Sequence, residues 1–348
     1  MALPSQGGNS NRGGMYRRHR VRRSATWFIV ILIAAGGTWM LWPDGNWSDS
    51  TNSTSENPQV VEESPAKTVV ALEEPNSTIT DTTPLQPLSV VVGTTPPNFN
   101  EGLQSLDQGE LSKARIQLSA TLRSGGLTDS EESQLRGVLT DISDLLVFSP
   151  EMTSGDPYAI EYIIQGGDTL SGIVNKMGLQ VDWRFIQRIN GISHASGIRP
   201  GQSLKLISGP FHAIVDKESY RIDLFLGDGD EQVFVRSYRV GLGEYNSTPT
   251  GLFKVRQHSK LVNPTWVNPR TRAFYSADNP ENPIGERWIG LQGAEERTYD
   301  LEGLGIHGTI EPQTIGTQAS MGCIRMHAED VAQVYEMLSE GVSTIEIK

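Results

Sequence analysis

The feature that most constrains this chain is an uncharged, mostly apolar run of 18 residues, Ala25–Trp42, near its amino terminus. As a helix the run would be about 27 Å long, close to the thickness of a bilayer core. Six arginines and no acidic residue precede it within 1–24. Basic flanks stay in the cytoplasm, so the pattern predicts a basic cytoplasmic tail (1–24), a single-pass transmembrane anchor (25–42) and a periplasmic or extracytoplasmic remainder. A cleaved signal peptide is the alternative, although no convincing small-x-small cleavage site precedes Trp39.

The length of the chain and its net charge limit the classes of protein to which it can belong. The chain has 348 residues, too many for one ordinary domain, and a formal net charge of −12 despite its basic tail. Nucleic acid is therefore excluded as a partner, because a nucleic-acid-binding domain needs a basic surface. Residues 43–97 are rich in Ser, Thr, Pro, Asn and Glu, which predicts a disordered linker.

Leucines recur at helical spacing through 98–148, with a break at Asp107-Gln108-Gly109. The segment resembles one tetratricopeptide-like (TPR-like) helix pair followed by a further helix. A single repeat cannot bury a large core, so the segment is predicted to be a small helical spacer. A binding site for an unknown protein partner is the alternative.

Residues 158–208 read as strand, helix, helix and strand. Gly167-Asp168-Thr169-Leu170, Asn190 and Arg199-Pro200-Gly201-Gln202 are the pieces that resemble a LysM domain. The resemblance implies binding to glycans that contain N-acetylglucosamine, including peptidoglycan. Candidate glycan-binding residues are Asp168, Thr169, Asn190 and Gln202, with helix capping as the competing role of Asp168 and Thr169.

The chemistry is expected in 211–348, where strand patterns dominate and a helix is expected near Ala328–Ser339. Cys323 is the only cysteine of the chain, and His307 lies 16 positions before it. An imidazole within reach of a thiol makes a strong nucleophile, and N–H groups in a tight turn at Gly322-Cys323 can bind an oxyanion. Arg325 shares a strand face with Cys323, where it could hold a carboxylate. The residues therefore indicate acyl transfer by a thiolate.

Zinc is the alternative role for a cysteine and a histidine. The chain lacks paired ligands at zinc-site spacing, so neither a metal nor another cofactor is predicted. Trp266, Tyr275 and Trp288 could line a substrate groove, with burial in the core as the other reading.

His307-Gly308, Ser320-Met321-Gly322-Cys323-Ile324-Arg325-Met326 and Thr248-Pro249-Thr250-Gly251-Leu252-Phe253 together resemble the YkuD-type L,D-transpeptidase domain over about 211–348. The resemblance implies that Cys323 is the nucleophile and His307 the base, and that the Gly308 carbonyl orients the imidazole. It also implies oxyanion N–H groups from Gly322 and Cys323, and roles in substrate binding for Ser320 and Arg325. Met321 replaces a histidine that many members have.

The family resemblance implies a reaction on peptidoglycan stem peptides. Cys323 would form a thioester with release of D-alanine, and an amine of a second stem would give a 3–3 crosslink. An L,D-carboxypeptidase, with water as acceptor, and a non-catalytic peptidoglycan-binding scaffold are the alternatives. The predicted fold is multi-domain: a mainly-β catalytic domain, a βααβ LysM domain, a small α-helical segment and one transmembrane helix.

Overall fold

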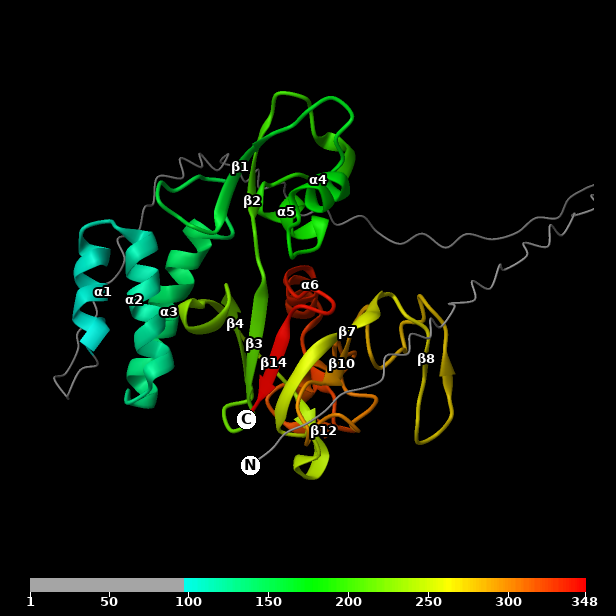
Figure 1. Cartoon of the computed structure of the whole chain (residues 1–348). Coiled ribbons are helices and arrows are strands. Elements are labelled where there is room, and N and C mark those ends of the chain that lie inside the picture. Colours follow the sequence, from blue (N-terminus) through cyan, green and yellow to red (C-terminus); the bar gives the residue numbers. More distant parts are fainter. Residues whose placement is uncertain (1–96) are drawn as a thin grey trace, which may run out of the picture. The chain divides into compact units, whose positions relative to one another are not determined.

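The computed structural model describes residues 97–348, and Figure 1 shows their elements. They contain a helical segment, a small α/β module and a larger sheet domain, in that order along the chain. No helix within 97–348 is long and apolar enough to cross a membrane. The expected tail, anchor and linker (1–24, 25–42 and 43–97) lie outside the described residues, apart from the last residue of the linker.

The helical segment has the three expected helices. Thr128 starts the third one with a capping box, because its hydroxyl accepts from the Glu131 N–H while the Glu131 carboxylate accepts from the Thr128 N–H. The helices are α1 (Pro97–Asp107), α2 (Leu111–Ser124) and α3 (Asp129–Leu146).

The second module has the strand–helix–helix–strand order expected of a LysM domain. Its two strands pair antiparallel, and both helices bury their apolar faces beside them. The elements are β1 (Ala159–Ile163), α4 (Leu170–Met177), α5 (Trp183–Ile189) and β2 (Ser203–Ile207).

The third module is built on an eight-stranded sheet with the order β13-β11-β10-β7-β14-β3-β4-β5. The β14–β3 and β11–β13 pairs are parallel, and the others are antiparallel. This confirms a mainly-β domain. The strands are β3 (Phe211–Asp216), β4 (Arg221–Leu226), β5 (Val233–Arg239), β7 (Gly251–Val262), β10 (Arg287–Gly293), β11 (Gly305–His307), β13 (Ile324–Arg325) and β14 (Thr344–Ile347).

Smaller elements complete this module. The pairs β6–β12 and β8–β9 lie outside the main sheet, and one α-helix, α6, follows β13. Their bounds are β6 (Leu242–Gly243), β8 (Trp266–Val267), β9 (Phe274–Tyr275), β12 (Gln318–Ser320) and α6 (Ala328–Met337).

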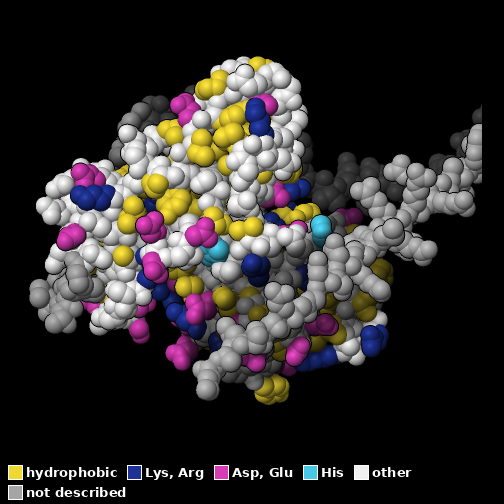
Figure 2. Space-filling model, in the orientation of Figure 1, with side chains coloured by type: hydrophobic (Ala, Val, Ile, Leu, Met, Phe, Trp, Pro, Cys, Tyr) yellow, Lys and Arg dark blue, Asp and Glu magenta, His cyan; other side chains and the backbone are white. Residues whose placement is uncertain are grey.

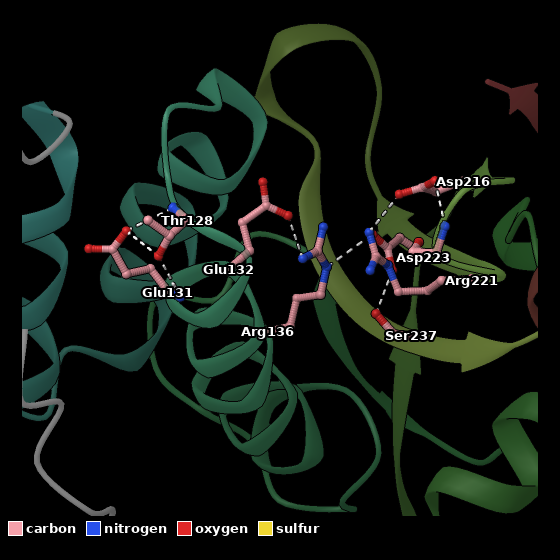
Figure 3. Close-up of polar contacts among 9 residues, drawn as sticks. Thr128, Glu131, Glu132, Arg136, Asp216, Arg221, Asp223 and Ser237 are labelled. Carbon is pink, nitrogen blue, oxygen red and sulfur yellow. Dashed lines mark hydrogen bonds and ion pairs between the residues drawn. The ribbon is translucent and has the colours of Figure 1, made fainter.

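The helical segment packs on the edge strand β5 and is part of the folded unit, and its role as a spacer stays a prediction. The Phe234 N–H donates to Ser119 Oγ of α2 at 2.9 Å, and the Phe234 carbonyl accepts from Ser143 Oγ of α3 at 3.2 Å. Figure 3 shows Arg136 of α3 reaching Asp223 of β4, with Nε 3.1 Å from Oδ2. The helices thus satisfy backbone groups that an open sheet edge would expose.

Three aromatic rings join the three modules. Phe148, just after α3, lies 6.0 Å from Phe185 of α5, and Phe185 lies 5.4 Å from Phe211 of β3, both centroid to centroid and edge to face. Phe185 and Phe211 are buried, and the same apolar core continues through all three modules.

Because Phe185 occupies this junction, Phe185→Ala should lower the free energy of unfolding by about 3–5 kcal/mol. Thermal unfolding followed by circular dichroism measures the change. Phe274→Ala is the matched control, since that ring is 65% exposed. Equal stability of the two variants would contradict a shared core.

Candidate active site

A cavity of about 300 Å³ brings together the predicted nucleophile, the predicted base and the two predicted substrate-binding residues. His307, Cys323 and Arg325 all line it, although they come from different segments. Trp266 and Trp288 also line the cavity, while Tyr275 packs against Trp266 with 5.8 Å between ring centroids. The other lining residues are Pro269, Pro283, Ile284, Glu302, Gly303, Ser320 and Met321.

Parallel pairing of β11 and β13 brings the two motifs side by side. The register pairs Ile306 with Ile324 and His307 with Arg325, and the Met326 N–H donates to the His307 carbonyl at 2.9 Å. Cys323 immediately precedes β13. The short strands therefore convert a separation of 16 residues into adjacency at one cavity.

The His307 imidazole is held by backbone and by an aromatic face. Its Nδ1 lies 2.6 Å from the Gly308 carbonyl oxygen, which can only accept, so Nδ1 carries the proton and Nε2 is free to act as a base. Trp288 stacks on the ring, with 5.7 Å between centroids and 19° between planes. Burial lowers the pKa of His307 to about 4. The imidazole is therefore neutral at physiological pH.

The Cys323 thiol is also neutral at rest. Burial raises its pKa above the usual value, against smaller opposing effects of the Gly305 backbone and Arg325. Its Sγ lies 3.5 Å from the Gly303 carbonyl oxygen. A low histidine pKa and a high thiol pKa both disfavour a resting thiolate–imidazolium pair. A nucleophilic role of Cys323 would therefore require proton transfer from Sγ as it attacks a substrate carbonyl.

Ser320 shapes the loop before the nucleophile. Its hydroxyl donates to the Cys323 carbonyl at 2.6 Å and accepts from the Gly322 N–H at 3.1 Å. Gly322 has a φ of +126°, which favours glycine. Of the two expected oxyanion donors, the Gly322 N–H is thus already engaged. The Cys323 N–H has no acceptor within 97–348.

Thr248 supports the same loop, a role that the sequence reasoning missed. Its side chain, which is 1% exposed, donates to the Gly322 carbonyl at 2.9 Å and accepts from the Gly243 N–H at 2.8 Å. A Cβ on Gly243 would lie 2.8 Å from the Gly322 Cα, so only glycine fits there. The signal was present, because Thr248 opens the Thr-Pro-x-Gly motif.

Arg325 is held by its own chain as well as facing the cavity. Its Nη1 lies 3.0 Å from Glu311 Oε2 and 3.3 Å from Thr314 Oγ1. Its Nε is buried and has no hydrogen-bond partner among the residues that the structure describes. Arg325 thus braces the loop 311–314 while it contributes positive charge to the cavity.

The four LysM candidates all make internal hydrogen bonds. Asp168 accepts from Tyr162 and from the Gln165 N–H, and Thr169 caps α4. Asn190 bonds both backbone groups of Lys205, and Gln202 accepts from the Arg199 N–H. The capping alternative therefore holds for Thr169, and glycan binding by these side chains stays a prediction.

The described residues carry charges of both signs and contain no cluster of potential metal ligands. Acidic and basic side chains are interspersed on the face shown in Figure 2. Within 97–348, no group of three or more His, Cys, Asp and Glu side chains could hold a metal ion. The chemistry that this site offers lies in its thiol, imidazole, guanidinium and backbone N–H groups.

A neutral thiol and a carbonyl-oriented imidazole in one cavity define a cysteine acyl-transfer site. Two segments of the chain also match known protein families. Residues 210–347 match the YkuD model, described as an L,D-transpeptidase catalytic domain, and residues 162–206 match the LysM domain.

Two relatives come from Bacillus subtilis (strain 168), and both are predicted L,D-transpeptidases. YqjB is 31% identical over 142 residues, which cover 40% of this chain and 72% of the relative. YkuD is 27% identical over 190 residues, which cover 52% of this chain and 95% of the relative. The chain therefore belongs to the YkuD family of L,D-transpeptidases.

Among solved structures, an L,D-transpeptidase from Mycobacterium smegmatis matches with a TM-score of 0.30 and 16% identity. The match covers 42% of this chain and 63% of that one. The family assignment rests on the sequence matches.

The lowered pKa of His307 predicts an unusual acid side of the pH–rate profile for Cys323 acylation. The base must be neutral, so the rate of Cys323 acylation should hold as pH falls through 6.5 and drop only near pH 4. Initial rates of covalent modification by a carbapenem between pH 3.5 and 8, measured by intact mass, test this. Trp288→Ala exposes the His307 ring and should shift the fall in acylation rate toward pH 6.5. If the wild-type rate already falls near pH 6.5, burial does not lower the pKa of His307 as described.

Proposed function

We propose that the chain forms 3–3 crosslinks between peptidoglycan stem peptides through a thioester on Cys323. The observation that carries this proposal is the shared cavity. His307 presents a free Nε2 there, oriented by the Gly308 carbonyl, beside Cys323 and Arg325. The family supplies the substrate class, and the geometry supports the role proposed for each residue.

In the first half-reaction, His307 Nε2 takes the Sγ proton as Sγ attacks the carbonyl between the L-centre of the diamino acid and D-alanine. The C–S bond forms, and the oxyanion is placed to accept from the Cys323 N–H. The C–N bond then breaks. His307 returns its proton to the leaving amine, so neutral D-alanine amine departs and the thioester remains.

In the second half-reaction, an amine of a neighbouring stem attacks the thioester. The new C–N bond forms and the C–S bond breaks. The proton lost by the amine reaches the thiolate through His307, which restores the thiol and the neutral imidazole. Water in place of the amine would give the carboxypeptidase product from the same acyl-enzyme.

Arg325 supplies positive charge near the carboxylate of the terminal residue. Its ion pair with Glu311 fixes the guanidinium before substrate arrives. The LysM module would hold the enzyme on glycan strands. The apolar run 25–42 would anchor the enzyme in the cytoplasmic membrane with its catalytic domain outside the cytoplasm.

Removal of the thiol tests the mechanism. Cys323→Ala should abolish both the carbapenem adduct and the crosslinked product, because no other described residue of the cavity is a thiol. Intact-mass analysis of the purified full-length protein counts adducts, and mass analysis of products from disaccharide-tetrapeptide reports crosslinks. An adduct or full crosslinking in Cys323→Ala would overturn the assignment.

His307→Ala is the companion variant. It should lose most of the acylation rate and regain some only at alkaline pH, where the thiol ionises without a base. Wild type that acylates but yields only tripeptide beside an acceptor stem would place the enzyme among the carboxypeptidases.

The proposed location is tested by reporters fused after Lys348. An alkaline phosphatase reporter, active only outside the cytoplasm, should work there, and a green fluorescent reporter exported in the same way should stay dark. Removal of residues 1–42 should reverse both signals. The opposite pattern in the full-length fusion would reject the topology.

A further inference from the structure

The LysM module is bound to the catalytic domain through one buried carboxylate. Arg188 of α5 holds Glu336 of α6 in a two-pronged contact, with Nε 2.7 Å from Oε2 and Nη2 2.7 Å from Oε1. The Glu336 side chain is 7% exposed and that of Arg188 45%. Paired, charge-assisted bonds of this kind fix the relative orientation of two groups as well as their separation.

The backbone of the same residue provides a second tie. The Glu336 carbonyl accepts from the Asp182 N–H at 2.8 Å, at the start of α5. Phe185 continues the contact one turn further along, against Phe211. Asp182, which caps α5, and Phe185 and Arg188 within it thus all meet the catalytic domain, which leaves little freedom for the module to rotate.

The helix that carries Glu336 also backs the catalytic site. It begins at Ala328, three residues after Arg325, and its Val331 lies against Gly308, where an added Cβ would come within 3.6 Å of Val331 Cγ1. Gly308 supplies the carbonyl that orients His307. A ten-residue helix, about 15 Å long, therefore links the LysM contact to the backbone of the catalytic base.

We infer that Arg188 and Glu336 are positioning residues that lock the LysM module in one register relative to Cys323, so that the enzyme acts preferentially on stems of the glycan strand that the module holds. The inference rests on the proposed function. A module on a free tether would only raise local substrate concentration. A docked module also fixes which stems along the strand can reach the cavity.

This ion pair suits orientation better than stability. The pair joins a buried carboxylate to a half-exposed guanidinium, and desolvation of the carboxylate offsets much of the attraction, but such a pair can specify one arrangement. The aromatic contacts of Phe185 remain when the pair is removed, so loss of the pair should loosen the docking without unfolding either module.

The experiment compares two substrates with full-length protein. Arg188→Ala and Glu336→Gln should form 3–3 crosslinks in intact peptidoglycan about tenfold more slowly, because a loosely docked module no longer keeps stems of the bound strand within reach of Cys323. Turnover of free disaccharide-tetrapeptide, carbapenem adduct formation and sedimentation with peptidoglycan should stay within about twofold of wild type, since neither side chain enters the cavity.

Arg184→Ala is the matched control. Arg184 lies on the same helix, but its ion pair, Nη1 to Asp182 Oδ1 at 3.1 Å, stays within the LysM module. It should resemble wild type on both substrates.

An equal loss of activity on both substrates would indicate that the ion pair has only a structural role, and would overturn the inference. Full activity of both variants on the polymer would overturn it as well. A wild-type enzyme that crosslinks neither substrate would defeat the proposed function, and this inference with it.

Discussion

The site depends on one short parallel pairing, between β11 and β13. Only two residue pairs make it, yet they place His307 beside Arg325, and Cys323 directly before β13 lines the same cavity. Because side chains alternate along a strand, a slip of one residue would turn the imidazole or the guanidinium away. The supports around the pair all hold this register: Ser320 and Thr248 fix the loop before Cys323, and Trp288 covers the ring.

The modules before the sheet domain contribute to its structure. Hydroxyls of α2 and α3 satisfy Phe234 at the edge of β5, and Phe148, Phe185 and Phe211 join three modules in one core. An edge strand left bare would be open to pairing with other chains. The helical segment is therefore part of the folded unit, and the LysM module is docked on it and on α6.

The sequence predicted what depends on local pattern. The three helices, the LysM order and the Cys323–His307 constellation followed from periodicity and motif, and the structure places Cys323 and His307 at one cavity. What it could not predict depends on long-range contact. The packing on β5, the grip of Arg188 on Glu336 and the engagement of the Gly322 N–H join distant residues or depend on one loop conformation, and no spacing rule encodes them.

The partner that orients His307 is a main-chain carbonyl, whereas many hydrolases use a carboxylate side chain for this task. A substitution at Gly308 cannot remove this oxygen, because every amino acid has a main-chain carbonyl group. Selection for escape from an acylating drug therefore cannot simply remove the third member of this constellation. It would have to act on Cys323 or His307, the proposed nucleophile and base, or on the walls of the cavity, which include Trp266, Ile284 and Met321.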